Sequence, residues 1–495
     1  MKRFHLYLMP LFVLFCLLIS GCSKDSNPDK TASTESVSEA TTEAVIPDTS
    51  NVSYENTLFD NGFVHQIDVK LADEDWTDLL DHAVDKTKYK ADIIIDGEEL
   101  KDVSFSTKGN SSLYFVAAEP DSSRFSFKVN FGKFVDGQTY HGLDKLNLNN
   151  NFCDATYMKD YFSYQLFNKA GVPAPLTSYV WLKVNGNDHG LYLAIEDEAD
   201  SFHKRVYSGE GVIYKPEGKS LGLTLDDVKD IMENGLPMTK NPHGADLIYT
   251  DDALESYPDI FENAETEAAE EDFKRVIAAL KDLSEGNPDK CLDTNESIRF
   301  FAAHNYLLNY DSYIGGMLHN LVLYENKGIL GLLPWDYNLA FATFAPGTGK
   351  EVLTDATNIV NQGIDSPLIA TTEDERPMWS WIVKDENYLK EYHDTMDVLM
   401  SDYFESGEFD KEYSELYEML LPYVEKDPTA FYSADEYKKG CETLRQFCKK
   451  RTESIRKQLS GELESVSENQ SDDKKVDASD INVMDMGAFV TEADR

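Results

Sequence analysis

Two aspartates, Asp311 and Asp336, lie 25 positions apart in an otherwise aromatic and aliphatic stretch of the chain. Asp336 is flanked by Trp335 and Tyr337 and follows the apolar residues 332–334. Ionising a carboxyl group in such surroundings is unfavourable unless a cation or hydrogen-bond donors stand close by. A bound divalent metal supplies that cation. The two aspartates therefore indicate a site for a metal and for the phosphates that such a metal binds.

The overall charge of the chain limits its partners. The 495 residues include 46 lysines and arginines against 90 aspartates and glutamates, a formal net charge of −44 at pH 7. A surface of this sign repels DNA, RNA and anionic lipid, so we expect no nucleic-acid partner. It also repels a nucleotide, so a nucleotide site in this chain requires local lysines or arginines and a metal ion.

The first 22 residues have the features of an export signal. A basic start, Met1–Arg3, precedes a nearly continuous apolar run over residues 6–19, and Ile19-Ser20-Gly21-Cys22 resembles a bacterial lipobox. The apolar run is too short for a stable transmembrane helix. We therefore predict a lipoprotein signal peptide over 1–22, lipidation of Cys22, and an extracytoplasmic protein that is lipid-anchored to the bacterial cell membrane. A plain signal peptide with an incidental cysteine is the alternative.

Composition also divides the rest of the chain. Residues 23–56 are rich in Ser, Thr and Glu and nearly free of large apolar side chains, which predicts a disordered tether. Residues 461–495 have a similar composition and are predicted to be a disordered acidic tail. Between them we expect a strand-rich N-terminal lobe over 57–196 and a mostly helical C-terminal lobe over 197–460.

Four cysteines, Cys153, Cys291, Cys441 and Cys448, remain once the signal peptide and the lipidated residue are set aside. Cys441 and Cys448 are seven positions apart in a helical pattern, which separates them by about 10 Å along the helix axis and puts them beyond the reach of a disulfide. We predict buried free thiols.

Hydrophobic periodicity places the secondary structure. Alternating patterns predict strands, and 3.6-residue patterns predict helices. Asp154 is the expected N-cap of the first helix, Gly171 its end, and Asn185-Gly186-Asn187 the turn of a hairpin. The expected strands are 65–71, 91–95, 103–107, 125–131, 145–149, 178–184 and 190–195, and the expected helices are 155–169, 198–206, 266–285, 294–310, 385–404, 410–424 and 434–459.

The common nucleotide and hydrolase motifs are missing. No GxGxxG, HExxH, GxSxG or paired CxxC occurs, and residues 347–350 lack the upstream Gly and the Ser or Thr of a Walker A loop. The sequence therefore contains no motif that supports a zinc-protease or α/β-hydrolase function.

Several short segments, in a fixed order, resemble the CotH family of spore-coat-protein-H-like atypical protein kinases. The likeness covers most of residues 57–460. The segments are Lys108-Gly109-Asn110-Ser111-Ser112, residues 124–129, 145–149 and 170–175, Asn185 to Glu196, His319-Asn320, Leu323-Tyr324, Pro334-Trp335-Asp336, Arg376-Pro377 and residues 451–459.

This resemblance implies an α+β fold of the atypical protein-kinase-like, bilobal type. It also implies transfer of the ATP γ-phosphate to Ser or Thr of a protein acceptor, with Mg²⁺ or Mn²⁺ as cofactor. The Ser- and Thr-rich tether at 31–53, with Ser460, Ser465 and Ser467, is available as an acceptor within the same chain.

The resemblance assigns the two aspartates different roles. Asp336 looks like the metal-binding aspartate and Asp311 like the catalytic base that orients the acceptor hydroxyl. Asn320 is the expected second metal ligand, although it lies nine residues after Asp311 rather than the five of the ordinary kinase loop. The family tends to have an acid two residues after the metal aspartate, where this chain has Asn338, and that change lowers the local negative charge.

The nucleotide-binding residues are expected on the strand-rich half. The basic candidates for the phosphates are Lys108, Arg124 and Lys128, and the backbone N–H groups of the loop at Gly109 and Ser111 are candidates to cradle them. Lys145 competes as the strand lysine, with Asp160 on the first helix as its acidic partner. Glu196 ends a strand where a kinase hinge would lie.

Each of these residues also has a structural interpretation. The aspartates could be capping or salt-bridged acids, Asn320 a structural hydrogen-bond former, and the lysines solvated strand residues. A non-catalytic surface binding protein, an adhesin or pseudokinase, is therefore the second function class, and a metal-dependent hydrolase a weaker third. The insert at 216–265 is more simply a variable surface loop than a cover of the cleft.

Overall fold

Seven strands between His65 and Glu196 form a closed barrel in the order β1-β2-β3-β4-β5-β7-β6. The ring is closed by parallel pairing of β1 with β6, in which Val69 lies opposite Val184. All other neighbours in the ring are antiparallel. The strands are β1 (His65–Lys70), β2 (Tyr89–Ile95), β3 (Glu98–Lys108), β4 (Ser126–Asn130), β5 (Lys145–Asn149), β6 (Thr177–Val184) and β7 (Asn187–Glu196).

The computed structural model describes residues 53–119, 122–217, 244–344 and 355–489. Each of the seven barrel strands overlaps a strand expected from the alternating pattern, and the hairpin between β6 and β7 turns at Asn185 and Gly186. Both turn residues have positive φ, 51° and 80°, as a two-residue type I′ turn requires. The predicted signal peptide, lipidation at Cys22 and most of the tether lie outside the described residues.

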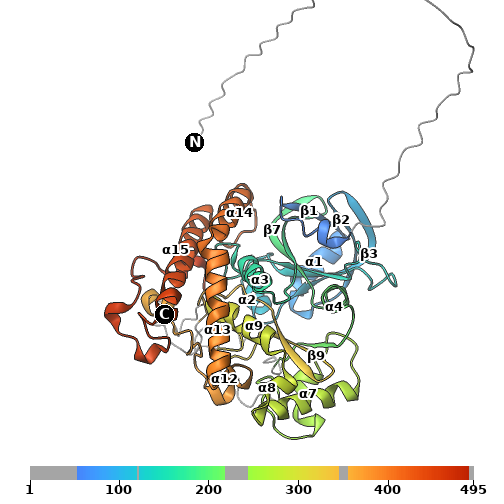
Figure 1. The fold of residues 1–495 in the computed structure, drawn as a ribbon. Coiled ribbons are helices and arrows are strands. Elements are labelled where there is room, and N and C mark those ends of the chain that lie inside the picture. Colours follow the sequence, from blue (N-terminus) through green and yellow to red (C-terminus); the bar gives the residue numbers. More distant parts are fainter. Residues whose placement is uncertain (1–52, 120–121, 218–243, 345–354, 490–495) are drawn as a thin grey trace, which may run out of the picture. The chain divides into compact units, whose positions relative to one another are not determined.

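The barrel is buried on two sides. Its interior holds one apolar core, with residues such as Ile67, Phe105 and Leu182 fully buried. The outward-facing side chains of β6 and β7, among them Trp181 and Leu193, belong instead to the core of the helical half. These two strands therefore join the barrel to the helices, and Figure 1 shows α14 next to β7.

The helix expected at 155–169 is shorter than its pattern. α3 spans Lys159–Lys169. Asp154 still binds the helix start, because its carboxylate accepts hydrogen bonds from the backbone N–H groups of Thr156 and Lys159, each at 2.9 Å. The carboxylate stabilises a turn before the helix, which is why the helix begins four residues later than predicted. Gly171, with φ of +76°, follows the helix end.

The second half is mostly helical but contains a sheet that the sequence did not predict. β9 (Leu321–Asn326) and β10 (Ile329–Pro334) form a hairpin whose turn residues, Lys327 and Gly328, both have positive φ, and β8 (Val212–Tyr214) pairs with β9. The two long strands are buried almost throughout, so they lack the alternation that reveals a half-buried strand. The α+β class is confirmed.

The remaining α-helices of the described chain lie in both halves. Those of the barrel half and its edge are α1 (Asp73–Asp81), α2 (Ser111–Ala118) and α4 (Asp200–Tyr207). Those of the second half are α6 (Pro258–Phe261), α7 (Glu270–Ser284), α8 (Pro288–Cys291), α9 (Thr294–Leu307), α11 (Ala356–Val360), α12 (Pro377–Val383), α13 (Glu386–Leu399), α14 (Glu408–Val424) and α15 (Ala434–Leu459). Within the residues described, no helix is both long enough and apolar enough to cross a bilayer.

The C-terminal segment differs from its predicted disorder. Residues 461–489 return along α15 with three short 3₁₀ turns, and Leu463, Val483 and Met486 are fully buried. The composition of the segment is dominated by solvated polar residues, and only a few spaced apolar side chains anchor it.

Folded structure also begins earlier than residue 57, because Tyr54 is buried and its hydroxyl donates to Glu196 at 2.6 Å.

The four cysteines of the folded part behave as predicted. Cys153, Cys291, Cys441 and Cys448 are free and buried.

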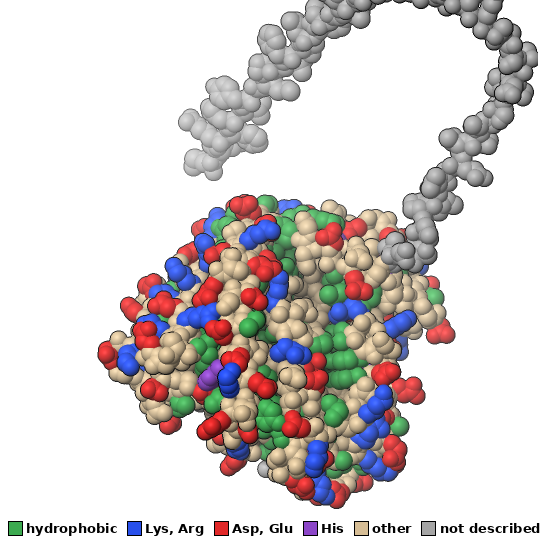
Figure 2. Space-filling view, in the orientation of Figure 1, with side chains coloured by type: hydrophobic (Ala, Val, Ile, Leu, Met, Phe, Trp, Pro, Cys, Tyr) green, Lys and Arg blue, Asp and Glu red, His purple; other side chains and the backbone are tan. Residues whose placement is uncertain are grey.

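On the surface, Figure 2 shows acidic and basic side chains intermixed over the visible face, with no broad basic patch there.

Candidate functional site

One cavity of about 410 Å³ brings the predicted chemistry together. Both halves of the folded chain contribute to its lining. Eight of the residues expected from the sequence line it: Lys108, Gly109, Ser111, Lys128, Asp160, Asp311, Asn320 and Asp336.

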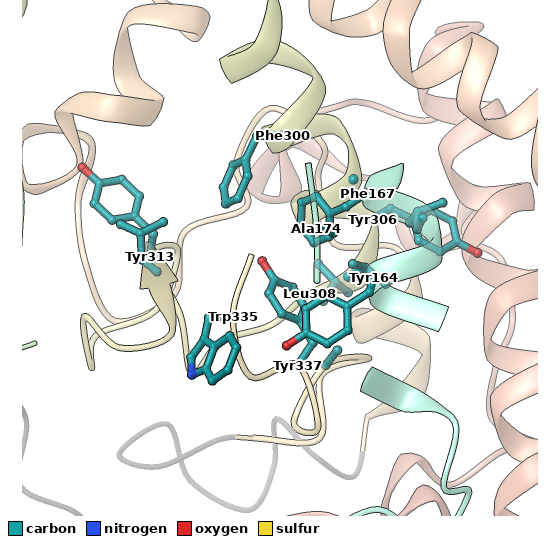
Figure 3. Close-up of a cluster of buried hydrophobic side chains, with 14 of the residues drawn as sticks. Tyr164, Phe167, Ala174, Phe300, Tyr306, Leu308, Tyr313, Trp335 and Tyr337 are labelled. Carbon is teal, nitrogen blue, oxygen red and sulfur yellow. The ribbon is translucent and has the colours of Figure 1, made fainter. Parts of the chain in front are cut away.

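Asp336 lies directly after β10, in a turn held by buried groups. Its backbone has φ of +56°, which is uncommon for a residue other than glycine and must be held by its surroundings. Its N–H donates to the hydroxyl of Tyr164 at 3.0 Å, and the N–H of Tyr337 donates to Asp160 at 2.6 Å. Tyr164, Trp335 and Tyr337 belong to the aromatic cluster of Figure 3. The cluster fixes the turn so that the Asp336 carboxylate lines the cavity.

Asp311 and Asn320 form a direct pair. The side-chain amide of Asn320 donates to the Asp311 carboxylate at 2.9 Å and to its backbone oxygen at 3.0 Å. Asn320 also has positive φ, 56°, and immediately precedes β9. Burial, and then the negative charge of Asp336, raise the pKa of Asp311 well above its usual value, while the Asn320 hydrogen bond acts in the opposite direction.

Lys108, rather than Lys145, is the strand lysine connected to the first helix. Its ammonium donates to the side-chain oxygen of Asn149 at 2.7 Å, and the amide of Asn149 donates to Asp160 at 3.4 Å. Burial lowers the pKa of Lys108 to about 8, although the nearby Asp336 raises it. Burial and then Asp336 raise the pKa of Asp160 to about 7. The expected lysine–acid pair is therefore replaced by a lysine–asparagine–acid chain.

Another lysine of the cavity, Lys215, was missed by the sequence reasoning. It follows β8, with its ammonium 4.7 Å from the ring centroid of Trp335, while Lys108 lies 5.5 Å from the same centroid. Burial lowers its pKa, but Glu217 and other acids outweigh that effect, so the pKa lies above its usual value. The only sequence signal was an isolated lysine in an acidic segment next to an apolar run, which does not distinguish it from a surface lysine.

Arg124 lies outside the cavity and has a structural role. Its guanidinium is buried and pairs with Asp427 at 2.9 Å, and it donates to the backbone oxygens of Asn150 and Leu191. Every one of these partners is an acceptor inside the protein, so the side chain joins the barrel to the segment that follows α14. The prediction of a phosphate-binding role for Arg124 has no geometric support.

Lys145 and Glu196 also do not line the cavity. The ammonium of Lys145 lies 3.8 Å from Asp144, next to it in the chain. Glu196 is fully buried, where it accepts hydrogen bonds from Tyr54 and Arg205. Lys128 lines the cavity but is paired with Asp197 at 2.6 Å.

The donor set suits a hard divalent cation. Asp160, Asp311 and Asp336 interact electrostatically, because Asp336 raises the pKa of the other two. Mg²⁺ typically takes one or two carboxylates and completes its shell with phosphate oxygens and water. In the parts of the chain that are described, no group of three or more His, Cys, Asp or Glu side chains is arranged around a common metal position. A cation here would therefore be held by Asp336 together with Asp311 or Asn320.

The chain was compared with known protein families and proteins. A family model described as CotH kinase protein matches residues 105–455. The chain belongs to the CotH family. The match contains both aspartates, Asn320, Lys108 and Lys215.

Two relatives come from Bacillus subtilis strain 168. Inner spore coat protein H is 21% identical over 334 residues, which cover 66% of this chain and 82% of the relative. Inner spore coat protein H-like protein is 29% identical over 103 residues, 21% of this chain and 32% of the relative. CotH membership confirms the family that the short segments indicated.

Proposed function

We propose that this chain is an extracytoplasmic, lipid-anchored protein kinase that transfers the γ-phosphate of ATP to Ser or Thr of a protein acceptor, with Mg²⁺ or Mn²⁺. The observation that carries the proposal is the convergence of Lys108, Asp311 and Asp336 on one cavity from three separate parts of the chain. Phosphoryl transfer needs positioning and charge stabilisation more than covalent chemistry, and these residue types supply both.

The bilobal, kinase-like interpretation of the fold is part of this proposal. The barrel takes the place of the strand-rich lobe and the segment from α4 onward that of the helical lobe, with the cavity lined from both. In this chain the strand-rich lobe expected from the sequence is a closed seven-stranded ring.

The phosphate end of ATP is assigned to the loop between β3 and α2. Gly109 has φ of +115°, a conformation that other residues rarely adopt, and Ser111 begins α2. The N–H groups at a helix start favour an anion. Lys108 and Lys215 add two ammonium groups next to Trp335, and these overcome the repulsion between a nucleotide and a chain of net charge −44.

The two aspartates divide the remaining work. Asp336 would hold the metal, which would supply positive charge to neutralise the phosphates. Asp311, oriented by Asn320, accepts a hydrogen bond from the acceptor hydroxyl and takes its proton as the oxygen attacks the γ-phosphorus, while the bond from that phosphorus to the bridging oxygen breaks and ADP leaves.

The test is labelled phosphate transfer by the purified chain with ATP and Mn²⁺ or Mg²⁺. Asp336→Ala is expected to abolish transfer while cooperative unfolding persists. Lys108→Met is expected to slow transfer by about 100-fold or more, because a charge that stabilises the transferred group is lost. Lys145→Met is the matched control, a barrel-strand lysine away from the cavity, and should retain the wild-type rate. Equal labelling by Asp336→Ala and wild type would overturn the site assignment.

One observation favours a second candidate, a non-catalytic surface binding protein. Asn338 donates its amide to the backbone oxygen of Phe152 at 2.9 Å, a bond that a carboxylate in its place could not make. If this asparagine has removed metal affinity, ATP with Mn²⁺ should leave the melting temperature unchanged, whereas binding well above Kd stabilises by several kcal/mol, about 2.7 at 100-fold excess.

The surface location and the acceptor also belong to the proposal. The relative named inner spore coat protein H supports a surface setting for this chain. The tether at 31–53 remains a proposed acceptor. Ser467 is a weaker one than the sequence indicated, because its hydroxyl oxygen accepts a hydrogen bond from the N–H of Gly363 inside the folded C-terminal segment.

A further inference from the structure

The C-terminal segment reaches the cavity although it lies beyond the part of the chain that the CotH family model matches. Residues 483–489 follow the matched range, which ends at 455. Phe489 lines the cavity and is only 7% exposed. Its backbone N–H donates to the oxygen of Thr343 at 3.0 Å, a few residues after Asp336. The wall of the site is therefore completed by the far end of the described chain.

Phe489 belongs to an aromatic wall built from distant parts of the sequence. Its ring centroid lies 5.0 Å from that of Phe115 in α2 and 5.9 Å from that of Phe344. Phe115 in turn stacks on Phe152 at 6.3 Å, and all four rings line the cavity. Phe489 thus supports α2, the helix whose start is assigned to the phosphates.

Lys159 connects the same segment to the first helix. Its ammonium is fully buried and donates to the backbone oxygen of Cys153 at 2.8 Å, the hydroxyl of Thr343 at 2.8 Å and the backbone oxygen of Gly487 at 2.7 Å. An ammonium group has three protons, so all are used. Lys159 is the first residue of α3 and precedes Asp160 of the cavity. It therefore holds the C-terminal segment and the helix start in one arrangement.

Two glycines permit this close approach. A Cβ atom at Gly487, where φ is +80°, would lie 2.6 Å from the backbone nitrogen of Ala155. A Cβ atom at Gly440 of α15 would lie 2.7 Å from the backbone oxygen of Asp485. Both distances are shorter than non-bonded contacts allow, so the docked position of the segment requires glycine at both places.

We propose that residues 483–489 are a fixed wall of the site, with Phe489 and Lys159 as positioning residues for the reaction. Phe489 sets the place of α2 and the phosphate loop, and Lys159 sets the start of α3 and Asp160. The role in catalysis rests on the proposed kinase function, whereas the structural role does not. The experiment therefore has one measurement for each.

The first measurement is hydrogen exchange on the full chain without nucleotide. In Phe489→Ala, amide exchange over 111–118 and 153–160 is expected to be faster by about tenfold or more, because the cavity left by a lost phenyl ring loosens its neighbours. Phe489→Leu retains most of the apolar volume and should restore slow exchange. Phe63→Ala, at a ring that is 49% exposed, is the control and should leave both segments unchanged.

The second measurement is the Kd for ATP with Mn²⁺ in the same variants. Phe489→Ala is expected to weaken binding by about tenfold, in line with the loosened loop, and Phe489→Leu to restore it. A wild-type chain that binds no ATP would refute the kinase function but leave the exchange measurement decisive. Unchanged exchange over 111–118 and 153–160 in Phe489→Ala would overturn the proposed wall.

Gly440→Ala gives a test of opposite sign. Alanine in a helix interior ordinarily stabilises a protein relative to glycine. Here its methyl group would displace Asp485, so exchange over 483–489 is expected to become faster in this variant. Gly487→Ala should act likewise, and Gly209→Ala is its control, since Gly209 has φ of +77° with nothing within 4 Å of its Cβ position. Equal behaviour of Gly487→Ala and Gly209→Ala would refute the close docking.

Discussion

The side-chain amide of Asn320 donates to the carboxylate of Asp311 at 2.9 Å, although the two residues are nine positions apart. In an ordinary kinase loop the spacing is five, so the sequence alone left the role of Asn320 uncertain. The structure places the two side chains together because the chain between them folds back, with the Ser312 hydroxyl donating to the backbone oxygen of Asn320 at 3.1 Å. Asn320 is thus a residue that orients Asp311, whether or not it also contacts a metal.

Replacing Asn320 with alanine tests that orientation. Without the amide the Asp311 carboxylate can rotate, so the transfer rate at saturating ATP is expected to fall by about 10- to 100-fold, a part of the roughly 100- to 10,000-fold that a positioned base contributes. The rate of labelled phosphate transfer is the measurement, with melting temperature to verify folding. A wild-type rate in this variant would show that the hydrogen bond has no part in the reaction.

Asn338→Asp tests why this chain departs from the acid that its family tends to have. The new carboxylate would face the backbone oxygen of Phe152, which now accepts a hydrogen bond. The variant loses that hydrogen bond and places a carboxylate oxygen next to a backbone oxygen, both of them acceptors. Without metal, its free energy of unfolding is expected to be lower by about 1–3 kcal/mol. Mn²⁺ should restore part of the loss, because a cation near Asp336 is then bound by one more charge.

The check on this variant is the melting temperature with and without Mn²⁺. The expected pattern is a lower value than wild type without metal and a larger upward shift with it. The same shift in variant and wild type would place Asn338 outside the reach of any bound cation.

The buried pair of Arg124 and Asp427 is predicted to govern stability rather than chemistry. Breaking it with Asp427→Asn or Arg124→Met leaves an uncompensated buried group, with an expected loss of about 3–5 kcal/mol in the free energy of unfolding. Urea unfolding measures this. Arg445→Met is the matched control, because its pair with Asp410 is exposed and such pairs contribute less than about 1 kcal/mol. Comparable losses in both variants would contradict the distinction.

Glu296 predicts a pH dependence of stability that is independent of the site. Burial, and then the charge of Asp293, raise its pKa to about 7 in the folded protein from a usual value of 4.5. The folded state therefore binds this proton more tightly than the unfolded state. The resulting stability is present below pH 4.5 and is lost as the pH rises to about 7. One pKa unit corresponds to about 1.4 kcal/mol, so the expected loss is about 1–3 kcal/mol.

Glu296→Gln removes that dependence. The free energy of unfolding should be measured in urea at pH 5 and pH 8 for wild type and variant. The variant is expected to have a higher free energy of unfolding than wild type at pH 8 and a similar one at pH 5. Glu271→Gln, at a side chain that is 77% exposed, is the control. A pH profile of Glu296→Gln that parallels wild type would refute the raised pKa.

The barrel strands were predictable because β1 to β5 place alternate residues in one core. Lys145-Leu146-Asn147-Leu148-Asn149 illustrates this, with its two leucines fully buried. β9 and β10 were not predicted, because strands buried on both faces show no alternation. The folded C-terminal segment was not predicted either. Only a few of its residues, such as Val483 and Phe489, are buried, and its composition is dominated by solvated polar side chains.

Part of the cavity was predictable and part was not. Asp311 and Asp336 were recognisable because a charged residue in an apolar run is costly and must be compensated. Arg124 and Lys108 are alike in sequence, each a basic residue at or near the end of a strand, yet Arg124 is buried against Asp427 and Lys108 lines the cavity. The difference comes from Asp427, which pairs with Arg124 from 303 positions away. The sequence around Arg124 does not reveal this partner.

The parallel pairing of β1 with β6 also sets the order in which the molecule can fold. His65 pairs with Val180, a separation of 115 positions, so the ring of strands cannot close until the chain through β6 is available. Contacts between residues so far apart are slow to form, since the loop entropy is lost before the contact is gained. We therefore expect closure of β1 on β6 to be the late step in forming this lobe, with the β2-to-β5 antiparallel meander assembling first.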